Sequence, residues 1–321
     1  MLSFVVRSSG LNPEEIWKSV DPLFYALAFC LFGFGFVLAA YRWYRLLRSI
    51  EVFMSFATVL RLAFIGQFFN LFIPGGVGGD LIKMVYLRRD SGERYPEAVL
   101  SVLLDRVLGL LGLLLLALGA ALFNLGFFDS GGQEMKAIRV LIVFAGLIGA
   151  SASLGFILWP HLSFLRAGQQ RLVQHLSPGL AGLLAKVGQA LSLVRSRPSL
   201  LFQLLFLAIL GHFLAGATVF CAAKGVSGTE VLSFLECLLS TQLANLVAAV
   251  PLTPGGIGGR DLTLAYLLKH SGATEAPTSV IPLVVTSLLI IWSSFGGLAV
   301  LWERKSGKQD SLPGGMSSEG Q

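Results

Sequence analysis

The residues of this chain that could do chemistry are charged and amide side chains set inside largely apolar segments. In the first half they are Arg61, Asn70, Asp80, Lys83, Asp105 and Arg106, and in the second half they are Gln242, Asn245, Arg260 and Asp261. A charge inside a membrane costs about 3 kcal/mol on insertion scales, so such groups are usually paired or functional. An arginine that faces a cavity can hold a phosphate with two parallel hydrogen bonds. These residues are therefore candidates for binding an anionic substrate.

The same residues also have a structural explanation. Either arginine of the first group, Arg61 or Arg106, could pair with Asp105 or Asp80 and tie two helices together. Asn70 and the amides of the second group could cap the backbone groups that a broken helix leaves without partners. The sequence leaves the functional and the structural explanation open for each residue.

The elements that must position these residues are membrane helices. Only 13% of the 321 residues are charged and 55% are hydrophobic, whereas a soluble domain carries about 25% charged residues. Stretches of about 20 residues with little charge, long enough to cross a bilayer, are found at 22–41, 98–128, 138–159, 200–222 and 279–302. The basic residues lie in short runs between them, which is typical of positive-inside loops and not of a nucleic-acid-binding patch. We therefore expect an all-α polytopic membrane protein with no nucleic-acid partner.

Two glycine-rich turns interrupt further apolar segments. Their residues are Pro74, Gly75, Gly76, Gly78 and Gly79 in the first turn and Pro254, Gly255, Gly256, Gly258 and Gly259 in the second. Proline removes a backbone donor and glycine relaxes the backbone dihedrals, so each turn is expected to break a helix. The units that contain them, 52–88 and 229–270, are each predicted to form a re-entrant hairpin of two half-helices.

The two units are predicted to be copies of one repeat. Each has a glutamine and an asparagine before its proline and a Tyr-Leu pair after its glycines, and the register from proline to Tyr-Leu needs no gap. In that register Arg260 stands where Asp80 stands, so the charge pattern is not symmetric. The basic flanks of the first unit and of the last span predict that the units enter from opposite sides. This is the inverted-topology repeat of secondary transporters, whose sites form where broken helices meet.

The expected organisation has five parts. Residues 1–21 form an interfacial segment, 22–159 the first membrane repeat, 160–198 a cytoplasmic amphipathic connection, 199–305 the second membrane repeat and 306–321 a disordered cytoplasmic tail. The connection is assigned from leucines at helical spacing. The basic residues after Trp302 predict a cytoplasmic C-terminus, and the expected location is a bacterial inner membrane.

Three motifs resemble a known family of membrane proteins. They are the run from Asn70 through the glycine turn to Lys83, the run from Ser101 to Arg106, and the run from Pro254 to Arg260. Together they resemble the lysylphosphatidylglycerol synthase transmembrane region, also called flippase-like, over about residues 20–305. The resemblance implies a flippase. In bifunctional aminoacyl-phosphatidylglycerol synthases this region accompanies an aminoacyl-transferase domain, and stand-alone members are linked to export of polyprenyl-linked sugars or hopanoids.

The expected function is therefore movement of an anionic or lipid-linked substrate between leaflets, the substrate being a phospholipid, an aminoacylated phospholipid, a polyprenyl-linked sugar or a hopanoid. The partners are membrane lipids, and a separately encoded lipid-modifying or glycosyl-transferase enzyme and an oligomer are compatible with this function. Only a short tail follows Trp302, and the sequence has no nucleophile elbow, metal-spaced cluster or phosphate-binding lysine loop. We expect no enzyme activity, no metal and no cofactor. A membrane-embedded lipid transferase and a secondary transporter of a small solute remain the alternatives.

Overall fold

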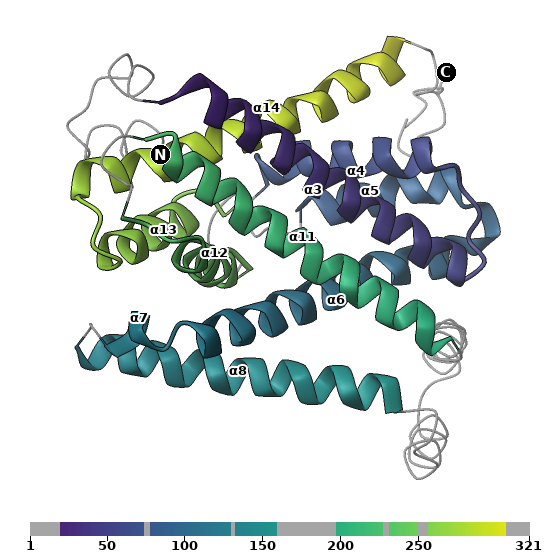
Figure 1. The fold of residues 1–321 in the computed structure, drawn as a ribbon. Coiled ribbons are helices and arrows are strands. Elements are labelled where there is room, and N and C mark those ends of the chain that lie inside the picture. The colour runs from purple at the N-terminus through teal and green to yellow at the C-terminus, as the bar shows by residue number, and fades with distance from the viewer. Residues whose placement is uncertain are drawn as a thin grey trace, which may run out of the picture.

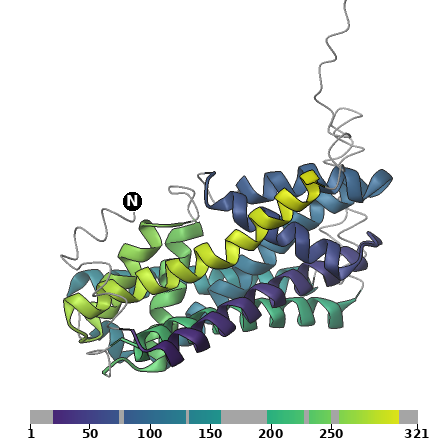
Figure 2. The ribbon, with the colours of Figure 1, turned by 90° about the horizontal axis from the view of Figure 1, so that it is seen from above.

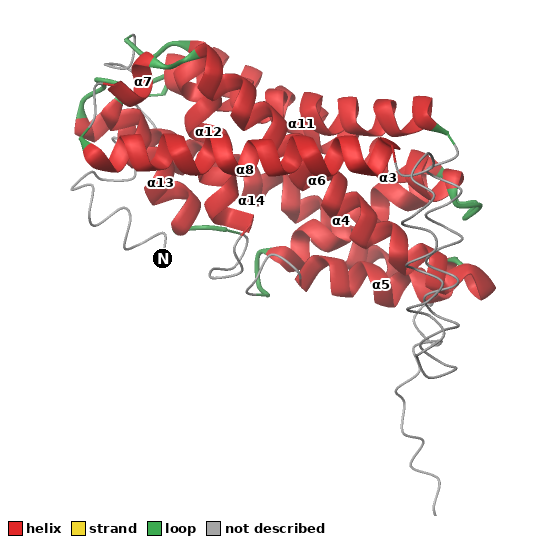
Figure 3. Cartoon of the chain, turned by 90° about the horizontal axis from the view of Figure 1, so that it is seen from below, coloured by secondary structure: helices red, strands yellow, loops and turns green. Residues whose placement is uncertain are grey.

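The computed structural model describes residues 20–73, 78–129, 132–158, 197–226, 231–249 and 256–305. Within these ranges every regular element is a helix (Figure 3). The helices are α3 (Pro22–Ser49), α4 (Phe56–Asn70), α5 (Gly78–Asp90), η1 (Gly92–Arg94), α6 (Tyr95–Phe123), α7 (Gly126–Asp129), α8 (Gln133–Leu158), α11 (Pro198–Lys224), α12 (Phe234–Ala249), α13 (Gly259–His270) and α14 (Glu275–Lys305). The all-α class is confirmed for this part of the chain.

Several expectations fall on other residues. The interfacial segment before Val20, most of the 160–198 connection and the tail from 306 lie outside the described residues. So do five of the turn residues, namely Pro74, Gly75, Gly76, Pro254 and Gly255. The expected division of the chain into five parts therefore stays a prediction.

Four described segments are long and apolar enough to cross a membrane. They are Pro22–Ser49, Gly92–Phe123, Pro198–Lys224 and Thr278–Trp302. The first helix of each glycine-turn unit is shorter, 15 residues for α4 and 16 for α12. At about 1.5 Å per residue, neither of these two helices covers a hydrocarbon core of about 30 Å.

Local capping sets several helix boundaries. Asp21 accepts a hydrogen bond from the Leu23 amide at 2.7 Å and precedes Pro22, the first residue of α3. Ser55 caps α4 by accepting from the Thr58 amide at 3.1 Å.

The first span is longer than the sequence indicated, since α3 continues from residue 41 to Ser49. In its last two turns, Arg42, Trp43, Leu46, Leu47 and Ser49 are buried, whereas Arg48 is exposed.

The α3 and α11 helices lie side by side in opposite directions (Figure 1). The amide of Asp21, at the start of α3, donates to the Gly225 carbonyl at the end of α11, at 2.8 Å. Near the other ends of the two helices, Arg45 donates to Gln203 at 3.0 Å. The pair forms a frame with two distinct ends, and the glycine-turn units can be placed relative to these ends.

The remaining long helices fix that placement. Trp43 near the end of α3 donates to Ser101 near the start of α6 at 2.9 Å, so these two helices are antiparallel. Tyr25 and Phe29 contact Ser287 and Trp292 in the same order along the chain, so α14 runs parallel to α3 (Figure 2). The α4–α5 unit therefore joins the long helices at one end of the frame, and the α12–α13 unit joins them at the opposite end (Figure 1).

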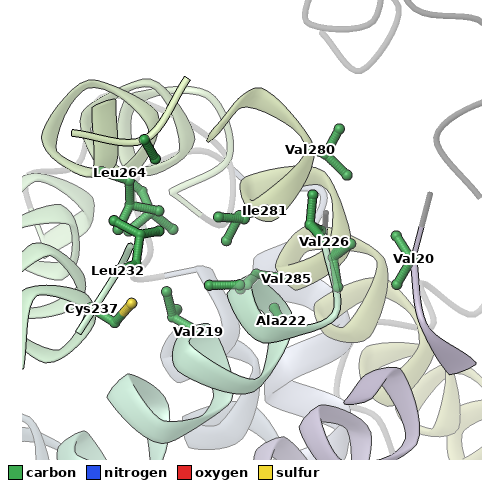
Figure 4. Packing of buried hydrophobic residues seen from close by; sticks show 14 of the residues in the cluster. Val20, Val219, Ala222, Val226, Leu232, Cys237, Leu264, Val280, Ile281 and Val285 are labelled. Atoms are coloured by element: carbon green, nitrogen blue, oxygen red, sulfur yellow. The ribbon is translucent and has the colours of Figure 1, made fainter. Parts of the chain in front are cut away.

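Each unit packs its second half-helix into an apolar cluster at its own end. Leu264 of α13 lies in a cluster with Val219, Ile281 and Val285 of α11 and α14 (Figure 4). Leu87 of α5 lies in a second cluster, which includes Leu46, Leu62 and Leu204 from α3, α4 and α11. Burial of these side chains anchors the helices on either side of each glycine turn.

A close helix crossing fixes α4 against the last span. A Cβ added at Gly296 of α14 would overlap the Phe64 carbonyl of α4. The aromatic side chains beside the crossing stack, with the rings of Phe64 and Trp292 6.2 Å apart and 11° from parallel. The first unit is thus packed directly against the last span, which belongs to the second half of the chain.

Candidate functional site

The asparagine of the first unit caps the helix that follows the break. Asn70, the last residue of α4, accepts a hydrogen bond from the Gly79 amide at the start of α5, at 2.7 Å. A Cβ at Gly79 would overlap both the Gly66 carbonyl and the Asn70 side chain, so only glycine allows the two half-helices to approach this closely. The structural explanation of Asn70 is therefore the one seen in the structure.

An aspartate occupies the first turn of α5. Asp80 is buried and forms an ion pair with Arg106 of α6 and a longer one, at 3.4 Å, with Lys83. Negative charge in the first turn is favourable because the helix dipole is positive there. Lys83 also lies 5.2 Å from the centre of the Trp43 ring. The start of α5, where the helix dipole favours an anion, is thus occupied by the chain's own carboxylate.

Arg106 is the most accessible member of this cluster. Its side chain is 39% exposed, whereas that of Asp80 is 8% exposed. The cluster of Asp80, Lys83 and Arg106 carries two positive charges against one negative charge. It is therefore a buried carboxylate held between two cations, with one cation open to its surroundings.

The other charged residues of the first half have partners that differ from those suggested by the sequence. Asp105 pairs with Arg42 of α3, at 2.8 Å, and not with Arg61 or Arg106. Arg61 pairs with Asp90, the last residue of α5, also at 2.8 Å. Neither Arg42 nor Asp90 was among the candidate residues that the sequence indicated. Arg42 is in fact buried, because α3 continues past it and packs against α6.

The second unit also has a buried first-turn aspartate. Asp261 of α13 accepts from the Gly258 amide at 3.3 Å, where the Gly258 φ angle of 95° favours glycine. Arg260 donates to Asp261 at 2.7 Å and to the Thr286 hydroxyl of α14 at 2.6 Å. Thr286 in turn donates to Asp261 at 2.9 Å. The arrangement is neutral and closed, unlike that of the first unit.

Equivalent positions of the two units make equivalent contacts. In the gap-free register of the glycine turns, Asp80 corresponds to Arg260, and the same register continued along the chain matches Arg106 with Thr286. In the first half of the chain these two positions are joined by the Asp80–Arg106 ion pair. In the second half the matched positions are joined by the Arg260–Thr286 hydrogen bond. The two contacts differ in chemistry, but each joins the start of a half-helix to the span that follows it.

The amides of the second unit differ in their surroundings. Gln242 is fully buried on α12 and donates to the carbonyls of His212 and Leu238, at 3.2 and 3.3 Å. Its Oε1 atom has no hydrogen-bond partner among the described residues. Asn245 lies one turn later and is half-buried. Gln242 thus joins α12 to α11.

The charged candidates do not converge on one point. One group lies between α3, α4, α5 and α6, and the other lies between α13 and α14 at the opposite end of the frame. Among the described residues no three His, Cys, Asp or Glu side chains are placed to hold a metal ion. The charged side chains thus form two separate groups, which we call charged stations. The first contains Asp80, Lys83 and Arg106, and the second contains Arg260 and Asp261 with Thr286.

Comparison with known proteins gives a match over most of the chain. The model of a family described as lysylphosphatidylglycerol synthase TM region matches residues 2–302. A UPF0104 membrane protein of Pyrococcus horikoshii is 23% identical over 308 residues, which are 91% of this chain and 90% of that protein. A UPF0104 membrane protein of Methanothermobacter thermautotrophicus is 24% identical over 306 residues, 89% of this chain and 87% of that protein. No solved structure matches the chain significantly.

Proposed function

The chain belongs to the lysylphosphatidylglycerol synthase TM region family, and we propose that it moves an anionic phospholipid or a lipid-linked anionic headgroup between the two leaflets of a membrane. The observation that carries the proposal is the placement of the two glycine-turn units. They join opposite ends of the long helices, and beside each helix break an arginine pairs with a buried aspartate, Arg106 of α6 with Asp80 and Arg260 with Asp261. A phosphate that crosses a bilayer needs charged partners along its path, since an unpaired charge in hydrocarbon is costly.

The architecture proposed for this function is an inverted-topology repeat. Three observations support it: the matched motifs, the attachment of the units at opposite ends, and the equivalent contacts 80–106 and 260–286. The 15- and 16-residue half-helices are re-entrant in this account. Substrate sites of such transporters form where broken helices meet near the middle of the membrane.

The first unit supplies the anion-binding chemistry. Arg106 is partly exposed and is held by Asp80, which Lys83 also contacts. An incoming phosphate can take the place of Asp80 on Arg106, because guanidinium binds carboxylate and phosphate with the same two-point geometry. Asp80 then retains Lys83 as its partner, so the exchange leaves no carboxylate without a cation.

The proposed orientation follows from the basic residues. Arg45, Arg48, Arg88, Arg89 and Arg94 gather at the end of the frame where α3 ends and α6 begins. Short loops rich in arginine face the cytoplasm. The first unit and the end of α14 are accordingly cytoplasmic, and the second unit opens to the outside.

The absence of enzyme activity is part of the proposal. Acid–base or nucleophilic catalysis needs groups that meet around one reacting atom. Here the charged groups are divided between two stations, and each aspartate is engaged by a cation or by backbone amides. This division fits passage of a substrate better than its chemical conversion.

Reconstitution tests the proposal. The purified chain is placed in phosphatidylcholine vesicles that carry a fluorescent phosphatidylglycerol, and loss of fluorescence on addition of a membrane-impermeant quencher reports the lipid that has reached the outer leaflet. A second panel uses fluorescent phosphatidylcholine and a polyprenyl phosphate. We expect the anionic lipids to move faster than in protein-free vesicles. Equal rates with and without the protein for every lipid would contradict the proposal.

A further inference from the structure

A second polar cluster lies between α3, α6 and α11, beside the charged station of the first unit. Arg42 of α3 holds Asp105 of α6 by two hydrogen bonds, Nε to Oδ1 at 2.8 Å and Nη2 to Oδ2 at 3.1 Å. One turn later on α6, the Gly109 carbonyl accepts from Nε2 of His212 on α11 at 3.1 Å. A Cβ at Gly109 would lie 3.5 Å from Nη2 of Arg42, so guanidinium and imidazole meet at the same turn.

We propose that His212 and the Arg42–Asp105 pair form a proton-binding site that couples the movement of lipid to a proton gradient. The inference rests on the proposed function, because it names the driving force for that transport. His212 is the one histidine that the described part of the chain places in the middle of a spanning helix. Histidine is the side chain whose ordinary titration lies closest to neutral pH.

The hydrogen bonds define the proton's position. A carbonyl oxygen can only accept, so Nε2 of His212 carries a hydrogen in the described state. The second proton therefore binds at Nδ1. The step breaks no bond in the lipid: one proton enters at Nδ1 from one aqueous side and leaves toward the other, and the imidazole returns to its neutral form.

The charges around His212 determine how its protonation would affect the Arg42–Asp105 pair. Protonation would place imidazolium and guanidinium beside a single carboxylate, Asp105, which can fully neutralise only one of them. The spanning part of α14, 278–302, has no acidic or basic residue, and Glu236 of α12 is held at the start of its own helix by Ser233. Protonated His212 must therefore weaken the Arg42–Asp105 pair.

Weakening of the Arg42–Asp105 pair would affect the charged station of the first unit, because Asp105 and Arg106 are adjacent on α6. Asp105 ties α6 to α3, and its neighbour Arg106 ties α6 to the buried Asp80 of the broken helix. A change in the first pair shifts the stretch of α6 that carries the second pair. Gln242 also links the His212 backbone to α12 of the second unit. The cluster thus lies where both units could respond to one proton.

A gradient experiment tests the coupling. Full-length protein in phosphatidylcholine vesicles with fluorescent phosphatidylglycerol is assayed at equal pH and with an imposed pH gradient, with and without a protonophore. We expect the gradient to raise the initial rate by at least about fivefold, the lower end of ordinary coupling between sites, and the protonophore to remove the increase. His212→Gln should keep the equal-pH rate and lose the response. A gradient response in His212→Gln, or no response in the unmodified protein, would overturn the coupling.

A second readout separates this inference from the proposed function. The same chain is labelled with isotopic histidine, and the His212 resonance is identified by its loss in His212→Gln. We expect it to titrate between pH 4 and pH 8 without any lipid substrate. A resonance that does not change over this range would overturn the proton site even if lipid moves. If the resonance titrates but no lipid moves under any gradient, the proton site stands and the proposed function fails.

Discussion

Arg42 and Asp105 form a two-point ion pair between α3 and α6, with contacts of 2.8 and 3.1 Å, in the interior of the helix frame. Both side chains are largely buried, at 10% and 21% exposure. Removing one partner of a buried pair leaves a charge without compensation, whereas replacing both partners can be nearly neutral. This asymmetry gives a direct test of the pair.

Arg42→Gln should destabilise the protein by about 3 kcal/mol, because it leaves the Asp105 carboxylate buried without a cation. The Arg42→Gln/Asp105→Asn double variant should recover most of this loss. Thermal unfolding in detergent measures both. A single variant as stable as the unmodified protein would show that the pair is not a structural tie.

Asn70→Ala should lower stability by about 1 kcal/mol, because the Gly79 amide loses its acceptor at the start of α5. Asn70→Asp keeps an acceptor at the same place and is the matched variant. Thermal unfolding of the two variants separates the cap from general packing. Equal losses in both would contradict the capping role.

Gly79→Ala should destabilise strongly, because the added Cβ overlaps the Gly66 carbonyl and the Asn70 side chain. The control is Gly119→Ala on α6, where a Cβ meets nothing within 4 Å. That change should be neutral or stabilising by less than about 1 kcal/mol. Similar unfolding temperatures for the two variants would argue against close approach of the half-helices at the first break.

Arg61→Gln should act on stability before it acts on transport. Arg61 pairs with Asp90 at the end of α5, so its loss leaves a carboxylate without that partner. Thermal unfolding and lipid movement are measured on the same purified variant. Loss of lipid movement with unchanged stability would instead place Arg61 on the substrate path.

Much of this fold could be predicted from the sequence because its signals are local. Apolar segments of span length and the proline–glycine turns identify the helices and their breaks without knowledge of their neighbours. The family resemblance is confirmed by the match over residues 2–302. The sequence indicated a first span at 22–41, whereas α3 continues to Ser49 and Arg42 is buried. Its burial depends on α6, which the local pattern does not show.

The pairing of charges could be predicted only in part. The Asp80–Arg106 pair was among the possibilities, but the Arg42–Asp105 and Arg61–Asp90 pairs were not. Asp105 and Arg106 are adjacent in sequence and point to different helices, α3 and α5, because consecutive residues of a helix face different directions. Which neighbour lies in each direction is decided by packing between distant segments.

In the proposed transport, Arg106 binds a lipid phosphate as the lipid moves between leaflets. The measurement compares fluorescent phosphatidylglycerol movement in vesicles for Arg106→Gln, Arg106→Lys and the control Arg94→Gln, whose side chain forms an exposed pair with Glu51. We expect loss of movement in Arg106→Gln, partial activity in Arg106→Lys because one charge remains without two-point geometry, and unmodified rates in Arg94→Gln. An Arg106→Gln protein that folds and moves the lipid at the unmodified rate would show that Arg106 does not bind the lipid phosphate during transport.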